Sequence, residues 1–240
     1  MDWEQRYRAG DTPWEKGAAS PPLLEWLESR GPMHGSVLVP GCGLGHDVRA
    51  IAGVCPTTQV VGLDVAPSAI DQARGFSLAG QESYQLADLF DLPRELTNRF
   101  AWVFESTCFC AIEPRHRPDY VRGVFCALQP AGAVLAIFFL NPWDPGEAPA
   151  EGGPPFSVTR EELDRLFGTH FELVEELKPR TAFPGREGRE IIRLLRRSPF
   201  TVRRSAFGVR TAQLSNGSRK HHWGEAFLSY RTTERIANLA

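Results

Sequence analysis

The sequence predicts an α/β fold in which helices cover both faces of a mostly parallel β-sheet. Short β-like runs alternate with helical runs from Ser36 onward, and this alternation is typical of parallel sheets. A glycine-rich turn over 41–45 joins the first of these strands to a helix. The chain has 240 residues, which is enough for one large globular domain.

The first 140 residues supply an N-terminal arm and five strands of the expected sheet. Residues 1–19 are rich in Trp, Tyr and charged residues and predict an aromatic arm, after which Pro21 and Pro22 open an apolar helical pattern. The strands are expected near 37–39, 60–63, 84–86, 102–104 and 134–140, and further helices at 47–54, 67–74 and about 117–128.

A Pro/Gly-rich loop over 141–155 follows the fifth strand. It lacks periodicity and is longer than an ordinary connection, so it is either a candidate active-site lid or a plain surface loop. Thr159 and Glu162 then form a capping box for a helix that ends near Phe167.

Two more strands, near 171–175 and 191–195, can complete the sheet. Beyond Arg197 the chain becomes rich in Arg, Ser, Thr and Gly. We therefore expect one domain over 1–197 and an appended basic tail over 198–240, either disordered or docked on the core.

Composition limits the classes of partner. The net charge is -2 and charges of both signs are scattered, so neither nucleic acid nor a membrane surface is an expected partner. The start of the chain has no signal-like pattern, and no apolar stretch approaches the ~18 residues of a membrane span. Five cysteines without a C-x-x-C pair predict neither disulfides nor a metal site. We expect a cytoplasmic protein that acts on small molecules.

The glycine turn predicts a nucleotide-like ligand. Gly41-x-Gly43-x-Gly45 lets backbone N–H groups approach a ligand closely, but His46 occupies the third-glycine position of the dinucleotide fingerprint. Asp64 ends the next strand about 20 residues later, where a carboxylate can accept from both ribose hydroxyls. The alternative role for Asp64 is the N-cap of the following helix.

Asp88 ends the third strand at the same edge of the sheet. A carboxylate there can accept from an adenine amino group while Leu89 or Phe90 packs against the ring. The alternative role for Asp88 is a turn aspartate.

Four separated motifs carry a family resemblance. They are Pro40–Asp47, Val61–Asp64, Phe109–Pro114 and Gly152–Phe156. In this order they resemble the thiopurine methyltransferase superfamily, especially its halide, thiocyanate and thiol methyltransferase branch. The resemblance spans roughly residues 3 to 197.

The resemblance implies a Rossmann-like class I methyltransferase with a seven-stranded sheet, a final antiparallel strand and S-adenosylmethionine (SAM) as cofactor. It also implies that Trp3, Tyr7 and Trp14 close over SAM, with tyrosine in place of a usual tryptophan at the second position. Aromatic faces suit a sulfonium cation. An arm that only packs on the core is the alternative, and the two roles are compatible.

Four further positions are candidates from the same resemblance. Glu105 and Ser106 follow the fourth strand beside the expected methyl site, and Ser106 differs from the tyrosine or arginine of the two branches, which leaves the substrate open. Arg117 matches a motif arginine that either forms a salt bridge or contacts substrate. Arg186 falls near an arginine that faces anionic substrates in the thiopurine enzymes, or is a surface residue.

The leading hypothesis is a SAM-dependent methyltransferase whose acceptor is a thiol, thiopurine, thiocyanate or halide. A soft anion needs no general base, and no histidine lies in a motif that would make it one. A SAM-binding regulatory or interaction protein without turnover is a second hypothesis. A nicotinamide-dependent oxidoreductase is disfavoured by His46 and by the lack of a Tyr-x-x-x-Lys pair. The oligomeric state is not predicted.

Overall fold

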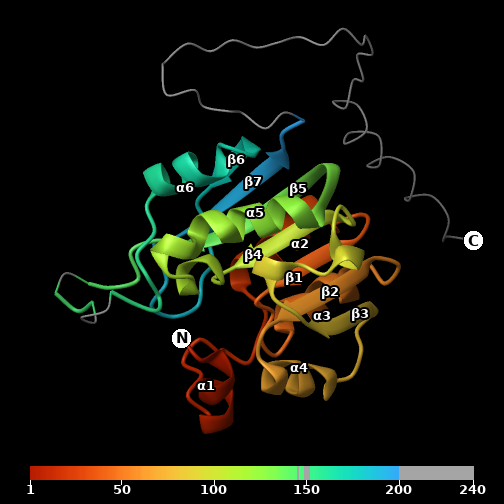
Figure 1. Cartoon of the computed structure of the whole chain (residues 1–240), viewed down its shortest axis with the longest axis horizontal. Coiled ribbons are helices and arrows are strands. Elements are labelled where there is room, and N and C mark those ends of the chain that lie inside the picture. Colours follow the sequence, from red (N-terminus) through yellow and green to blue (C-terminus); the bar gives the residue numbers. More distant parts are fainter. Residues whose placement is uncertain (145, 149–151, 200–240) are drawn as a thin grey trace, which may run out of the picture. The chain divides into compact units, whose positions relative to one another are not determined.

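The structure is a computed structural model that describes residues 1–144, 146–148 and 152–199. Within these residues a seven-stranded sheet has the order β3-β2-β1-β4-β5-β7-β6 (Figure 1). The five strands β1 to β5 are parallel, and β7 is antiparallel to both β5 and β6. The strands are β1 (Val37–Pro40), β2 (Gln59–Asp64), β3 (Gln81–Leu86), β4 (Phe100–Ser106), β5 (Leu128–Phe139), β6 (Phe171–Leu177) and β7 (Glu190–Arg197). The mostly parallel sheet and its late antiparallel strand are thus confirmed.

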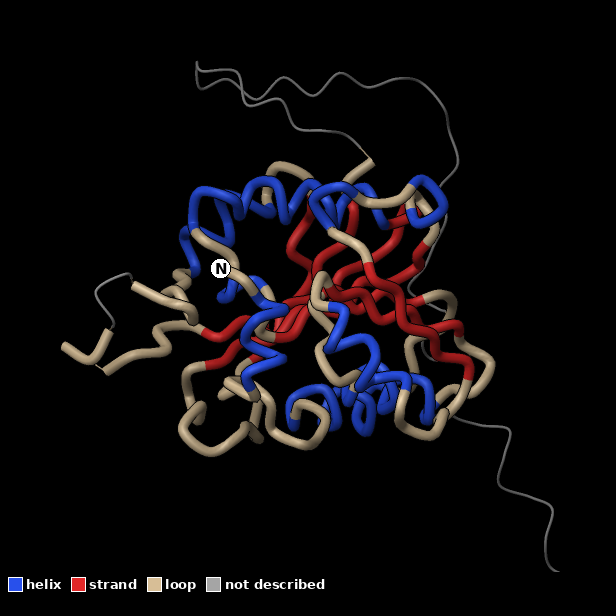
Figure 2. The backbone as a smooth tube through the Cα atoms, turned by 60° about the horizontal axis from the view of Figure 1, so that its bottom comes forward, coloured by secondary structure: helices blue, strands red, loops and turns tan. Residues whose placement is uncertain are grey.

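Helices lie on both sides of the sheet, as Figure 2 shows. The α-helices are α1 (Trp3–Ala9), α2 (Pro21–Arg30), α3 (His46–Val54), α4 (Pro67–Arg74), α5 (Arg117–Ala127) and α6 (Arg160–Phe167). Short 3-10 turns are η1 (Leu89–Asp91), η2 (Arg94–Leu96), η3 (Phe109–Ala111) and η4 (Pro114–His116). Thr159 accepts a hydrogen bond from the Glu162 N–H at the start of α6, which confirms one half of the predicted capping box. The Glu162 carboxylate pairs with Arg117 instead of closing the box.

Alternation along the strands divides the core between the two faces. In β1, Leu38 packs with the cluster under α5 and α6, whereas Val37 and Val39 pack with the cluster under α2, α3 and α4. All residues of β1 are buried. Successive side chains point to opposite faces, so a strand covered on both sides must be apolar throughout.

The strand β5 starts six residues earlier than predicted. Leu128 pairs with Phe100, and a register shift then brings Ala133 opposite Trp102. Between them, Ala131 has a positive φ of 63°. The intervening Gln, Pro, Ala and Gly residues have no β-like pattern, so this pairing depends on the neighbouring strand rather than on local sequence.

The aromatic arm begins with a helix, α1, that the sequence did not predict. Asp2 accepts from the Gln5 N–H at 3.0 Å, and Gly10 ends the helix in the left-handed conformation. Glu4 accepts from the N–H and the hydroxyl of Ser68 at 2.9 and 2.8 Å. These bonds hold α1 against the start of α4, beside which it lies in Figure 1.

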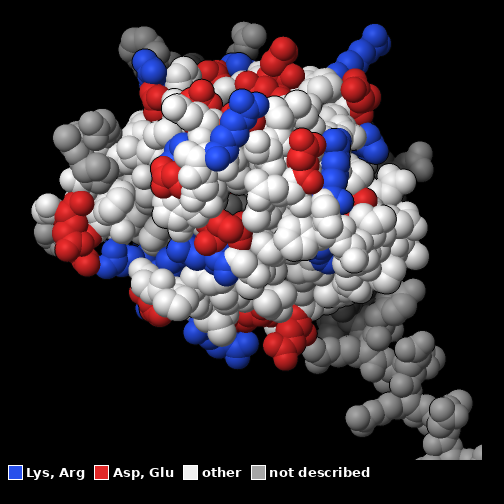
Figure 3. Space-filling model, turned by 90° about the horizontal axis from the view of Figure 1, so that it is seen from below, with Lys and Arg blue, Asp and Glu red and all other residues white. Residues whose placement is uncertain are grey.

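Acidic and basic side chains are interspersed over the face shown in Figure 3. No helix among the described residues is both long and apolar enough to cross a membrane. From residue 200 onward, the tail expected over 198–240 lies outside the described residues.

Candidate functional site

A cavity of about 660 Å³ lies at the carboxyl ends of β1, β2 and β4. The chain leaves β1 toward β2 on one side, and β4 pairs with β1 on the other side, so this is the switch point at which ligands bind in open α/β sheets. Its walls come from the arm, the glycine turn, the ends of four strands, and the segments near residues 143, 155 and 186.

The glycine turn forms the floor of the cavity beside β1. Gly41, Gly43 and Gly45 have φ values of 60°, 51° and 75°. A Cβ at Gly41 would lie 2.6 Å from the Cys108 sulfur, and one at Gly45 would lie 2.4 Å from the Tyr84 ring. Only glycine is compatible with both the backbone conformation and the close neighbours at these two positions.

Asp64 connects the glycine turn to the end of β2. Its Oδ2 accepts from the Gly43 N–H at 2.9 Å and its Oδ1 from the Ala66 N–H at 3.0 Å. The side chain also lines the cavity, and burial raises its pKa. The N-cap of α4 is Ala66 rather than Asp64. Asp64 is therefore free to present its remaining lone pairs to a ligand while it fixes the turn.

Asp88 lies on the same side of the cavity as Asp64, just after the neighbouring strand β3. Its Oδ1 accepts from the Phe90 N–H at 2.8 Å, so it caps the short turn η1. Asp88, Leu89 and Phe90 all line the cavity. The sequence offered a turn residue and a ligand contact as alternatives for Asp88. In the structure Asp88 both caps a turn and lines the cavity.

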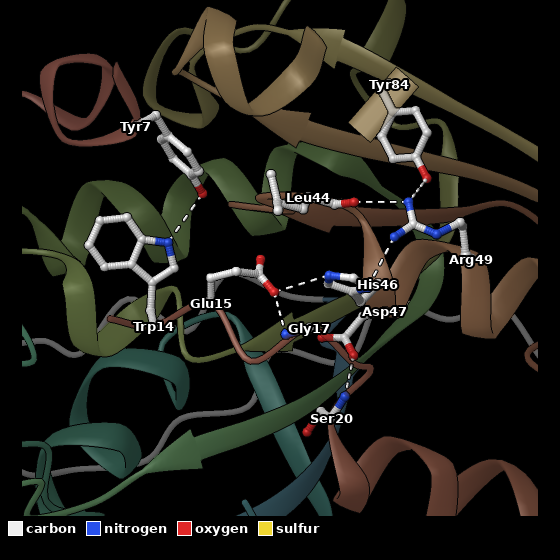
Figure 4. Close-up of polar contacts among 10 residues, drawn as sticks. All are labelled: Tyr7, Trp14, Glu15, Gly17, Ser20, Leu44, His46, Asp47, Arg49 and Tyr84. Carbon is white, nitrogen blue, oxygen red and sulfur yellow. Dashed lines mark hydrogen bonds and ion pairs between the residues drawn. The ribbon is translucent and has the colours of Figure 1, made fainter. Parts of the chain in front are cut away.

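The three predicted arm aromatics meet at the cavity wall. Trp3 and Trp14 make an edge contact with ring centroids 5.3 Å apart, and Tyr7 makes another with Trp14 at 5.7 Å. The Trp14 indole N–H donates to the Tyr7 hydroxyl at 3.2 Å (Figure 4). All three line the cavity, so the arm forms its aromatic wall.

A polar network ties the end of the arm to α3 (Figure 4). The Arg49 guanidinium lies 3.1 Å from His46 Nδ1, and since it can only donate, Nδ1 is the acceptor. His46 Nε2 then carries the proton and faces Glu15 Oε1 at 3.0 Å. Glu15 also accepts from the Gly17 N–H at 2.6 Å.

Asp47 strengthens this connection from the first turn of α3. Its Oδ1 accepts from the Ser20 N–H at 2.7 Å. Burial raises the pKa of Asp47 to about 6, opposed by that hydrogen bond. Sequence reasoning missed Glu15 and Asp47 as site residues, although both line the cavity. An acidic residue in a first helical turn was the available signal.

Glu105 and Ser106 differ in their positions. Ser106 lines the cavity, whereas Glu105 lies beneath it and is only 1% exposed. The Glu105 carboxylate accepts from the Tyr120 hydroxyl at 2.5 Å and from the Phe109 N–H at 3.0 Å. Tyr120 itself lines the cavity.

Of the two candidate arginines, only Arg186 lies at the cavity. Arg186 lines the cavity, with its guanidinium carbon 4.8 Å from the centre of the Phe139 ring and Nη1 3.4 Å from a Glu190 oxygen. Arg117 is 1% exposed, does not line the cavity, and forms an ion pair with Glu162 at 2.6 Å.

The described parts of the 141–155 loop border the cavity as well. Trp143 and Pro155 line it, and the Trp143 indole N–H donates to the Pro155 carbonyl at 2.8 Å. Just beyond the loop, the Phe156 N–H donates to the Cys110 carbonyl at 2.7 Å. These bonds attach the loop to the cavity wall. Whether it moves as a lid stays a prediction.

Comparison with known proteins identifies the family. The model of the thiopurine S-methyltransferase family matches residues 1–204. The chain belongs to this family. The methyltransferase is 34% identical over 193 residues to the probable thiol methyltransferase 2 of Arabidopsis thaliana, covering 78% of this chain and 81% of the relative. It is 36% identical over 161 residues to thiocyanate methyltransferase 1 of Brassica oleracea, covering 65% and 66%.

A solved structure supports the fold. The 1,6-didemethyltoxoflavin-N1-methyltransferase of Burkholderia thailandensis, crystallised with bound 1,6-didemethyltoxoflavin and S-adenosylhomocysteine, superposes with a TM-score of 0.63. It covers 82% of this chain and 86% of its own at 19% identity. The likeness shows a Rossmann-like fold, and the family match makes the protein a SAM-dependent methyltransferase.

The cavity suits SAM by its chemistry. Two carboxylates, Asp64 and Asp88, lie at the carboxyl ends of adjacent strands, where hydroxyl and amino donors can reach them. The glycine turn presents backbone rather than side chains, since Cβ atoms at Gly41 and Gly45 would collide with their neighbours. The aromatic wall offers π faces, which suit a cation.

Burial of Glu105 makes stability depend on pH. Burial raises its pKa to about 7, so between pH ~4.3 and ~7 the folded protein keeps a proton that the unfolded chain releases. The free energy of unfolding should fall by about 3 kcal/mol as pH rises through this window. Urea unfolding near both ends of the window measures the change. Glu105→Gln should reduce it, leaving a smaller part from Asp47, and an undiminished change would contradict this origin.

Proposed function

We propose that this methyltransferase transfers the methyl group of SAM to a small soft nucleophile: a thiol, a thiopurine, thiocyanate or a halide. The observation that carries the proposal is the division of one cavity into two chemically different sides. Asp64 ends β2 and Asp88 lies just after β3, whereas Phe139 and Arg186 lie by β5, across β1 and β4 from them.

The side beside β2 and β3 is proposed to hold SAM. Asp64 would accept from the ribose hydroxyls, Asp88 from the adenine amino group, and Leu89 would pack against the adenine ring. Trp3, Tyr7 and Trp14 would face the sulfonium. When bound, SAM supplies an electrophilic methyl group. The protein has to align the nucleophile, exclude water and place complementary charge.

The side beside β5 is proposed to hold the acceptor. Its walls are mainly apolar and include Phe139, Trp143, Pro155 and Phe183, with the Arg186 guanidinium among them. A polarizable anion gains attraction from the guanidinium and loses little hydration in an apolar site. The names of the relatives, which are thiol, thiocyanate and thiopurine methyltransferases, agree with this acceptor class.

An acceptor panel tests the proposal. We expect conversion of SAM to S-adenosylhomocysteine with at least one of thiols, thiopurines, thiocyanate and iodide, and methylated product in equal amount, measured by mass spectrometry. Because transfer to a soft anion needs alignment rather than proton removal, turnover with anions should change little near neutral pH. SAM binding by calorimetry without turnover of any acceptor would instead favour a regulatory protein.

We also propose a domain extent, a cytoplasmic location and a class of partner. The family match over 1–204 supports a catalytic domain close to the predicted 1–197. The five cysteines are free, which is compatible with the reducing cytoplasm. Mixed surface charge supports small molecules rather than nucleic acid as partners.

A further inference from the structure

Acceptors of the proposed reaction differ in whether they carry a proton that must be removed. Neither the apolar wall nor the always-charged Arg186 can accept a proton. Thiocyanate and iodide carry no proton, whereas an alkyl thiol with a pKa of ~8.5 is mostly neutral at pH 7. Its proton has to leave when sulfur takes the methyl group. In a cavity that excludes water, a protein group must accept that proton.

Tyr120 and Glu105 provide such a group directly beneath the cavity. Tyr120, on α5, lines the cavity, and its hydroxyl donates to Glu105 Oε2 at 2.5 Å. Glu105 Oε1 accepts from the Phe109 N–H at 3.0 Å, which fixes the carboxylate. A hydroxyl that donates to a carboxylate still has lone pairs with which to accept from a second donor.

We propose that Tyr120 and Glu105 form a proton-accepting pair for neutral thiols. The inference rests on the proposed methyl transfer and adds a route for the proton. As the S–CH3 bond forms and the bond from the methyl group to the sulfonium sulfur breaks, the thiol proton moves to the Tyr120 oxygen. The original Tyr120 proton moves to Glu105. Tyrosine ends neutral, the carboxylate ends as a carboxylic acid, and the products are the thioether and S-adenosylhomocysteine.

The surroundings of Glu105 suit a proton acceptor. Facing it are Tyr120 from α5, Cys108 and Cys110 from the segment after β4, and Asp47 from α3. Burial raises the pKa of Glu105 to about 7, and the negative charge of Asp47 adds to this. The pKa of Tyr120 is raised far above its usual value, so its hydroxyl passes a proton on rather than ionising. Proton transfer to a carboxylate of this basicity is effective near neutral pH.

The test compares three acceptors within each variant. An alkyl thiol has to lose a proton, 4-nitrothiophenol is already ionised at neutral pH, and iodide has no proton. In Tyr120→Phe, which removes only the hydroxyl, kcat/KM for the alkyl thiol should fall at least ~100-fold relative to that for iodide. The value for 4-nitrothiophenol should follow iodide. A packing defect would lower all three together and leave the ratios unchanged.

Two further measurements complete the test. Tyr84→Phe removes another buried tyrosine hydroxyl, which accepts from Arg49 and is not among the cavity residues, and it should leave the ratios as in wild type. In Glu105→Gln, alkyl-thiol turnover should rise about tenfold per pH unit below the thiol pKa, because only preformed thiolate reacts. Wild-type turnover should level off above pH ~7.

The possible results distinguish failure of the Tyr120–Glu105 proposal from failure of the proposed methyl transfer. If wild type methylates none of the three acceptors, the proposed methyl transfer fails. If wild type methylates them and Tyr120→Phe keeps the thiol-to-iodide ratio, methyl transfer stands and the proton-accepting pair is overturned. A wild-type pH profile that keeps rising above pH ~7 as steeply as that of Glu105→Gln would also overturn it.

Discussion

Asp64→Ala is expected to weaken SAM binding by at least ~100-fold, since each hydrogen bond to a charged group contributes ~1.5–3 kcal/mol and tenfold in affinity is ~1.4 kcal/mol. The substitution removes the proposed ribose acceptor. It also leaves the N–H groups of Gly43 and Ala66 without the carboxylate that now binds them. The first loss acts on the bound state, and the second weakens affinity by loosening the glycine turn before SAM binds. Calorimetric titration with SAM measures their combined effect.

The matched control is Asp71→Ala, on α4. That side chain is 78% exposed, so its removal should leave the affinity for SAM unchanged. A smaller loss is expected for Asp88→Ala, because its carboxylate fixes a short turn rather than the glycine turn. Wild-type affinity in Asp64→Ala would contradict the placement of SAM.

The parallel part of the fold could be predicted because strands covered on both faces are apolar without interruption, and β1 shows this in all its residues. The helix α1 could not. It has no buried residue, and it is held by the Asp2 cap and by a bond from Ser68 to Glu4 that spans 64 positions. Local periodicity carries no signal of such a contact.

Some residues of the candidate site could likewise be predicted from the sequence, and others could not. The glycine turn, Asp64 and Asp88 lie at strand ends, and the geometry of a parallel sheet brings strand ends together. Glu105 also ends a strand, yet its carboxylate turns toward Tyr120 beneath the cavity. Strand position gives the edge of the sheet at which a residue lies. It does not give the direction of the side chain, which packing decides.

Tyr120 shows a second limit of prediction from the sequence, which concerns polar pairs. In the sequence it belongs to a helical pattern and is equivalent to any apolar residue facing the core. Its role depends on one oxygen atom and on a partner 15 positions away. Glu15 and His46 are a similar pair, joined across 31 positions at 3.0 Å. A polar pair of this kind is visible only when the fold brings both members together.

The second large effect is expected for Arg117→Ala, which should lower the free energy of unfolding by about 3–5 kcal/mol. The buried guanidinium pairs with Glu162 and donates to the carbonyls of Ile112, Phe156 and Ser157. Removing it leaves a carboxylate and three carbonyls without their donor. The guanidinium thereby joins α5 and α6 to the segment that ends the 141–155 loop.

Urea unfolding of Arg117→Ala and Arg115→Ala separates the two roles that the sequence left open for Arg117. The Arg115 side chain is 74% exposed beside Glu113, so its removal should change stability by no more than ~0.5 kcal/mol. A substrate contact would instead leave the stability of Arg117→Ala near wild type and raise KM for the acceptor alone. We expect the opposite order, because a group that lies outside the cavity and has four protein partners acts on the acceptor only through the loop it holds in place.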